Sequence, residues 1–142
     1  MNNRIYLRAL ELDYKTTIQW RKDAEIENMV GRPIRYISSE REKQWIHDCI
    51  FDESRMVLGI CLKENDKLIG NVNIQDFDNN SRSCHIPILI GDKSEWGKGY
   101  ATEARMMALN IAFNERNIQR VWAKVLDTNL PSLKMHEKCG YK

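Results

Sequence analysis

Hydrophobic positions along the chain change their spacing several times, and each change predicts a new element of secondary structure. Alternation with a period of two predicts strands, whereas apolar residues three and four apart predict helices. Asp13 is a candidate cap for the first helix, and Ser39 with Glu42 forms an S-x-x-E capping box for the third. The elements expected in the first part of the chain are a strand over 4–9 and helices over about 14–22, 23–29 and 39–50.

The middle of the chain predicts an antiparallel meander, because three strand patterns follow one another with short Asp- and Asn-containing turns between them. A helix, a strand and a last helix follow, and a strand–helix–strand order favours a parallel crossover. We therefore expect an α/β or α+β domain with a mixed, mostly antiparallel sheet flanked by helices. These later elements are strands over 56–62, 67–74, 82–90 and 119–125, a helix over 100–114, and a helix that Asn129 caps and Gly140 ends.

Composition narrows the class of protein. A chain of 142 residues with 42% hydrophobic and 30% charged residues fits one globular domain over 1–142. The net charge of +2 argues against direct binding of nucleic acid or a membrane surface. The N-terminus has no apolar signal-peptide core, and no apolar stretch approaches the roughly 18 residues of a membrane span. We expect a cytoplasmic protein.

The four cysteines predict no metal site and no disulfide framework. They form no C-x-x-C pair and match no zinc-binding spacing. We expect them to be small buried side chains in a reducing compartment. They are Cys49, Cys61, Cys84 and Cys139.

A glycine loop between the strand over 82–90 and the helix over 100–114 carries the strongest chemical signal. Gly97 and Gly99 flank Lys98, so the backbone can adopt positive φ just before a helix N-terminus. Unpaired N–H groups and the helix dipole favour an anion there, most often a phosphate. A P-loop does not match, a dinucleotide fingerprint lacks its third glycine, and an ordinary strand–helix turn remains an alternative.

Three blocks of sequence together resemble the GCN5-related N-acetyltransferase (GNAT) superfamily, and most closely its branch that acetylates ribosomal protein N-termini. The first block, 96–104, resembles the family's coenzyme A loop, and 67–70 resembles its third strand. The third joins Asn129-x-x-Ser132 to the stretch 136–141. The resemblance implies acetyl-CoA as cosubstrate, no metal, and direct attack by a primary amine of a small molecule or a protein N-terminus. It also implies a coenzyme cleft between two splayed parallel strands.

The resemblance also implies roles for particular residues. The pantetheine arm would be held by backbone groups of Leu89, Ile90 and Gly91 and by Asn129. Ser132 and His136 would face the sulfur, with His136 as general acid where many members have tyrosine. His85 and Asp76 are candidate bases for the amine. The pyrophosphate loop would comprise Trp96, Gly97, Lys98, Gly99, Tyr100, Ala101 and Thr102.

The C-terminal end departs from the family pattern. Members usually continue past the glycine–aromatic pair with strands that close the sheet, whereas this sequence stops at Lys142. We therefore expect the C-terminal strands to be missing, either because the sequence is truncated or because a second subunit of a homodimer completes the sheet. An alternative function follows: a coenzyme A-binding or structural dimerisation module without catalysis.

Overall fold

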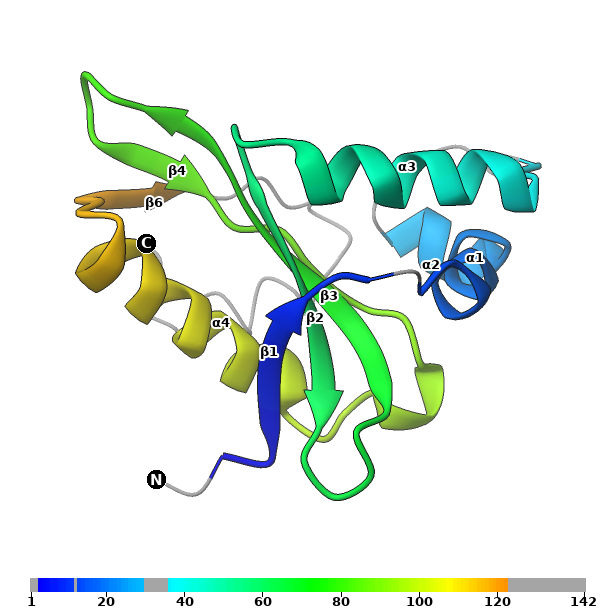
Figure 1. The fold of residues 1–142 in the computed structure, drawn as a ribbon. Coiled ribbons are helices and arrows are strands. Elements are labelled where there is room, and N and C mark those ends of the chain that lie inside the picture. Colours follow the sequence, from blue (N-terminus) through cyan, green and yellow to red (C-terminus); the bar gives the residue numbers. More distant parts are fainter. Residues whose placement is uncertain (1–2, 12, 30–35, 123–142) are drawn as a thin grey trace.

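The computed structural model describes residues 3–11, 13–29 and 36–122, with side chains for all of these except 27–29. Helices flank a central sheet, and α4 lies apart from α1, α2 and α3 (Figure 1). The elements, in order, are β1 (Ile5–Ala9), α1 (Tyr14–Arg21), α2 (Ala24–Met29), α3 (Ser39–Phe51), β2 (Met56–Leu62), β3 (Leu68–Asp78), β4 (Ser83–His85), β5 (Ile88–Ile90), the 3₁₀ turn η1 (Lys93–Glu95), α4 (Tyr100–Asn110), the π-helical turn η2 (Ile111–Glu115) and β6 (Arg120–Trp122).

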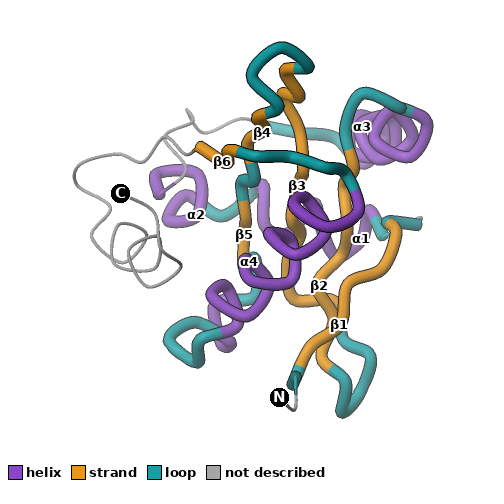
Figure 2. Tube along the Cα trace, turned by 90° about the vertical axis from the view of Figure 1, so that its left-hand side faces the viewer, coloured by secondary structure: helices purple, strands orange, loops and turns teal. Residues whose placement is uncertain are grey.

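Six strands of the described chain form one mixed sheet in the order β1-β2-β3-β4-β6, and β5 also pairs with β3. All pairs are antiparallel except β4 with β6, which run parallel. The mixed, mostly antiparallel sheet and its parallel crossover through α4 are therefore confirmed. In the chain, α4 follows β5 and precedes β6. Figure 2 shows that α4 lies across one face of the sheet.

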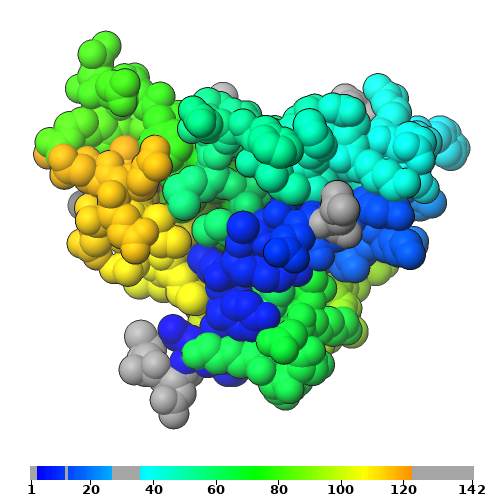
Figure 3. Space-filling view, in the orientation of Figure 1, coloured from blue at the N-terminus to red at the C-terminus, as the bar shows by residue number. Residues whose placement is uncertain are grey.

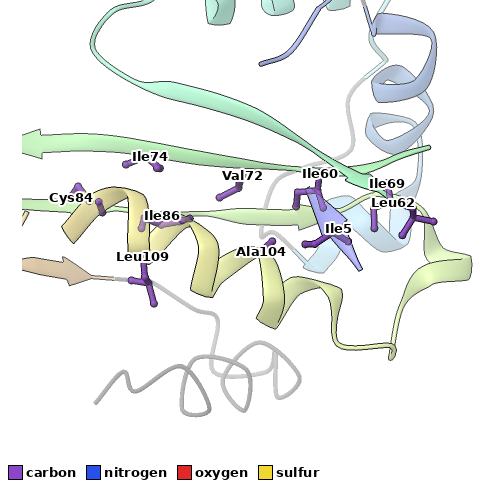
Figure 4. Packing of buried hydrophobic residues seen from close by; sticks show 12 residues of the cluster. Ile5, Ile60, Leu62, Ile69, Val72, Ile74, Cys84, Ile86, Ala104 and Leu109 are labelled. Carbon is purple, nitrogen blue, oxygen red and sulfur yellow. The ribbon is translucent and has the colours of Figure 1, made fainter. Parts of the chain in front are cut away.

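The main core lies between the sheet and α4. Ala104 and Ala108 of α4 and Ala112 of η2 are fully buried against apolar side chains from β1 to β4 (Figure 4). Small side chains allow the helix to approach the sheet closely, as their helical spacing predicts. On the other face, Trp20 of α1 and Ile26 of α2 pack on Cys61 and Leu68, while Cys49 of α3 packs on Val57.

Several boundaries differ from the sequence prediction. The strand expected over 82–90 is two strands, β4 and β5, because Pro87 lacks an N–H for the ladder. The strand expected over 67–74 runs on to Asp78. The helix expected to reach residue 114 changes from α-helical to π-helical hydrogen bonding after Asn110. The strand expected over 119–125 is described only as β6, and the final helix lies outside the described residues.

Two predicted helix caps are also corrected. The cap of α3 is Ser38, one residue earlier than predicted, and its Oγ accepts a hydrogen bond from the Arg41 N–H at 3.2 Å. Asp13 occupies the N-cap position of α1 but makes no capping bond. Its carboxylate instead pairs with the Arg8 guanidinium at 3.0 Å, because that stronger charged partner lies within reach.

The prediction that the cysteines are small buried side chains is confirmed for three of the four. Cys49, Cys61 and Cys84 are free and buried, whereas Cys139 lies outside the described residues. Burial raises the pKa of the Cys84 thiol to about 11, so it stays protonated and unreactive at neutral pH. Among the described residues, no group of three or more metal-ligating side chains is placed to hold an ion, and no helix has the length and apolar content to cross a bilayer.

Candidate functional site: the glycine loop and the edge of β5

The loop before α4 adopts the backbone conformation that its glycines predict. Gly97 has φ of +78° and Gly99 has φ of +86°, and Gly99 is the N-cap residue of α4. Any other residue would be strained there. A Cβ on Gly97 would meet no atom within 4 Å, whereas one on Gly99 would lie 3.3 Å from Nη2 of Arg4. Backbone conformation therefore explains Gly97, and both conformation and close approach explain Gly99.

Two side chains hold the loop in place. The indole Nε1–H of Trp96 donates to the Ile90 carbonyl at 2.7 Å, which ties the loop to the end of β5. Lys98 pairs with Glu95 at 3.0 Å, and half of its side chain remains exposed. Trp96 also packs against the buried apolar cluster that contains Trp20 and Ile26. Trp96 thus shapes the loop from beneath, while the Lys98 ammonium stays near the surface.

An ion pair fixes the turn between β5 and the loop. Asp92 accepts a hydrogen bond from the Ser94 N–H at 3.0 Å and pairs with Lys67 at 2.6 Å. The Lys67 ammonium and the Ser94 hydroxyl hold the pKa of the Asp92 carboxyl below its usual value. Gly91, which precedes it, lies under Trp20, where a Cβ would be only 2.0 Å from the indole ring. Glycine is therefore required at position 91 by packing, because any side chain would overlap the Trp20 indole.

The first turn of α4 offers backbone N–H groups to a ligand. The N-cap Gly99 has no side chain to accept from them, and the first N–H groups of a helix have no acceptor within it. Gly97, Lys98 and Gly99 are exposed. These features fit a pyrophosphate, since its oxygens are strong acceptors and the helix dipole favours negative charge.

One carboxylate lies in this first turn and would oppose an anion. Glu103 is neutralised by Arg4, whose backbone N–H and Nε–H donate to its two oxygens at 2.9 and 2.7 Å. The same guanidinium lies 4.4 Å above the Tyr100 ring. Arg4 therefore cancels an unfavourable charge beside the loop and holds the start of α4 against β1. The pair could not be predicted from the sequence, because 99 residues separate its members.

The edge of β5 away from β3 has no strand partner within the described ranges. The Asn73 N–H donates to the Pro87 carbonyl, and the Gly91 N–H donates to the Ile69 carbonyl. The pair Asn71–Leu89 lies midway between these two hydrogen-bonded pairs. Because antiparallel bonds alternate, the backbone groups of Leu89 point toward β3. Those of Ile88 and Ile90 point to the unpaired edge, where the Ile90 carbonyl already accepts from Trp96. Ile88 is thus a further candidate for contact with a pantetheine arm.

A buried arginine supports the break between β4 and β5. The Nη1–H of Arg105 on α4 donates to the Ile86 carbonyl at 2.6 Å, and the residue is only 2% exposed. The one signal for it in the sequence is a cation on the alanine face of a helix. Arg105 gives the carbonyl before Pro87 a partner and so stabilises the break.

The two candidate bases lie together on the sheet face opposite α4. Nδ1 of His85 is 3.5 Å from Oδ2 of Asp76, and the imidazole stacks on the Trp122 ring with centroids 4.3 Å apart. Asp76 has φ of +55°, in the left-handed region. Its backbone departs from regular strand where its carboxylate meets the histidine. Asn129, Ser132 and His136 lie outside the described residues, so their roles stay predictions.

A separate cavity of about 430 Å³ opens between the β3–β4 hairpin and the connection from α3 to β2. Figure 3 shows the three segments that supply its lining on one face of the molecule: the green hairpin, the teal connection, and the orange segment before β6. Asp76 is its one link to the His85 pair, and no glycine-loop residue reaches it. Its lining residues are Glu53, Ser54, Asp76, Phe77, Asn79, Arg116 and Ile118.

Comparison with known proteins identifies the family to which this fold belongs. Residues 4–142 match the family model of the acetyltransferase (GNAT) domain. The chain therefore belongs to the GNAT acetyltransferase family. It is 30% identical over 142 residues to an uncharacterized N-acetyltransferase, p20, of Bacillus licheniformis, a match that covers 98% of this chain and 79% of that protein. The narrower branch that acetylates ribosomal protein N-termini stays a prediction.

Solved structures show the same fold. Spermidine N-acetyltransferase from Vibrio cholerae, crystallised with CoA and spermine, superposes with a TM-score of 0.87 at 24% identity, covering 98% of this chain and 81% of that one. A domain from Methanocaldococcus jannaschii superposes with a TM-score of 0.82 at 24% identity, covering 99% and 90% of the two chains. At this identity the likeness establishes architecture, and substrate has to be argued from the residues of this chain.

The glycine loop makes a prediction about acetyl-CoA affinity. Replacing Gly99 by Glu places a carboxylate where the pyrophosphate is expected, so we predict a loss of affinity on the order of 100-fold by calorimetric titration. Gly99→Ala is the matched control, because it adds the same left-handed strain without charge, and it should lose roughly tenfold or less. Equal affinities for wild type and Gly99→Glu would remove the loop from the coenzyme site.

The Arg4–Glu103 pair makes a second prediction. Arg4→Met leaves the Glu103 carboxylate uncompensated beside the loop, so the Kd for acetyl-CoA should rise about fivefold. The double variant Arg4→Met/Glu103→Gln removes both charges and should return to near the wild-type Kd. A double variant as weak as Arg4→Met alone would mean that Arg4 acts by direct contact or by packing, and not by cancelling Glu103.

Proposed function

We propose that this protein is an acetyl-CoA-dependent N-acetyltransferase that transfers the acetyl group to a primary amine by direct attack. The observation that carries the proposal is the uncapped start of α4, with its two left-handed glycines, next to the unpaired edge of β5. The loop suits the pyrophosphate, and the strand edge suits the amide groups of the pantetheine arm. The coenzyme in the Vibrio cholerae neighbour is consistent with this assignment.

The reaction requires three proton and charge adjustments. The acceptor arrives as an ammonium, with a pKa of about 10 for a lysine-like amine, and must lose a proton before its nitrogen can attack. The new C–N bond forms as the C–S bond breaks, and negative charge on the carbonyl oxygen needs a donor. The Ile88 N–H is the described group best placed for that contact, because it points to the open edge of β5. The leaving thiolate takes a proton, for which His136 remains the predicted donor, and Ser132 remains a predicted polar contact near the sulfur.

His85 is the proposed base, with Asp76 as the residue that orients it. A neutral imidazole can take the ammonium proton, and a carboxylate 3.5 Å from its Nδ1 stabilises the charged form that results. Trp122 restricts the ring to one plane by stacking. The pair lies on the sheet face opposite α4, and His85 precedes Pro87 by two residues. An acceptor on that face would approach the end of the arm held along β5.

The proposal is tested by binding and turnover measured separately. Calorimetry should show acetyl-CoA binding, and a thiol-release assay should show coenzyme A formed only when a primary amine is present. Mass shifts across a panel of N-terminal peptides, polyamines and small amines would identify the acceptor. Binding without acetylation of any amine would favour the coenzyme-binding module, and absence of binding would favour a structural module.

The assignment of His85 predicts a particular pH dependence. His85→Phe should keep the stack on Trp122 and lower kcat about 100-fold near pH 7, with acetyl-CoA affinity unchanged. The deficit should shrink toward pH 10, because the acceptor then loses its proton without help. His47→Phe, on the exposed surface of α3, is the matched control and should leave kcat unchanged. A deficit that is equal at both pH values would exclude His85 as the base.

A further inference from the structure

Three amide side chains form a continuous row on the sheet face opposite α4. Asn71, Asn73 and Gln75 occupy alternate positions of β3, so all three project from the same face. The Asn71 Nδ2–H donates to Asn73 Oδ1 at 3.1 Å, and the Asn73 Nδ2–H donates to Gln75 Oε1 at 3.1 Å. Each side chain is half-buried.

The row lies beside the site of the proposed chemistry. Gln75 is paired in register with His85, and Asn71 is paired with Leu89. Asn73 donates its backbone N–H to Pro87, at the break between β4 and β5. The row therefore runs alongside the stretch from the base candidate to the strand edge proposed to hold the coenzyme arm.

Packing alone does not account for these residues. Asparagine is depleted in strands, and a half-buried strand position normally favours β-branched or aromatic side chains. Apolar clusters flank the row on both sides, around Leu68 with Leu89 and around Val57. Apolar residues at Asn71 and Asn73 would join these clusters into one core. A polar interruption at this place is typical of a surface that recognises a ligand.

The row is uncharged and has spare hydrogen-bonding capacity. Within the described chain, the side-chain hydrogen bonds of these three residues are to one another, which leaves amide hydrogens and oxygen lone pairs available. The neighbouring carboxylate, Asp76, is already paired with His85. Alternate residues of a strand are about 7 Å apart, which is also the repeat of an extended peptide.

We propose, on the basis of the proposed acetyltransferase function, that Asn71, Asn73 and Gln75 select an acceptor whose amine is followed by neutral amide groups, as in an extended peptide N-terminus. An extended peptide lying along β3 meets one side-chain amide for every two of its residues, and each can both donate and accept. A polyamine has a second ammonium group where the peptide has neutral backbone amides. That charge finds no carboxylate in the row, and an unpaired charge near a half-buried surface is costly.

The test compares two probes on the full chain saturated with coenzyme A: trialanine amide with a free N-terminus, and spermidine. Binding is measured by calorimetry, and acetylation by mass shift with acetyl-CoA. Wild type should prefer the peptide at least tenfold over spermidine. Asn73→Asp keeps the size and adds one carboxylate, so the preference should move toward spermidine by about tenfold or more. Gln75→Glu should shift it in the same direction, which guards against poor folding of one variant.

Asn65→Asp is the matched control, because it adds the same charge in the exposed β2–β3 turn and keeps the acceptor for the Lys67 N–H. It should leave the ratio of the two probes unchanged. A wild-type preference for spermidine, failure of both probes to bind, or equal ratios in the row variants and the control would each overturn the inference. Failure of the acetyltransferase proposal is seen separately, as probe binding without acetylation of either probe.

Discussion

Pairing along both edges of β3 determines where the groups of the candidate site lie. One edge binds β2, and the other binds β4 and then β5, on either side of Pro87. Because the bonds to β5 alternate, the pairing of Leu89 with Asn71 turns Ile88 and Ile90 toward the open edge. The same register sets His85 opposite Gln75. The proposed coenzyme contacts and the proposed base are thus positioned by one strand.

Charge compensation is the second constraint on the site. A helix N-terminus that is to bind a phosphate works best without a carboxylate nearby, yet Glu103 lies in the first turn of α4. Arg4 resolves this conflict by binding both carboxylate oxygens and covering the Tyr100 ring. Glu103 then serves as a link between β1 and α4, and the loop keeps its positive potential. The anion-binding end of the helix and the first strand are therefore coupled.

The sequence was sufficient for features that depend on local patterns. Strand and helix order, the parallel crossover, the buried cysteines and the left-handed glycines all follow from periodicity or from the chemistry of single residues. The strand break at Pro87 could have been predicted, since proline lacks the N–H that the ladder needs. The apolar residues on both sides of Pro87 instead suggested one continuous strand. The pairs Arg4–Glu103 and Arg105–Ile86 could not be predicted, because they join segments that only the folded chain brings together. For the same reason alternation alone could place Asn71 and Asn73 on one face without showing what that face adjoins.

One face of β3 packs in the core and the other carries the amide row, and the register of the strand fixes both at once. Val72 and Ile74 are fully buried toward α4, and the amide row occupies the positions between and beside them. A one-residue slip of β3 would exchange the two sets and bury the amides in the core, so packing against α4 enforces the orientation of the row. The irregular points of the strand, at its pairing with Ile60 and Cys61 and between Gln75 and Asp78, lie at either end of the row and leave it regular. Side-chain changes within the row can therefore alter what the surface recognises while the core that fixes its register remains intact.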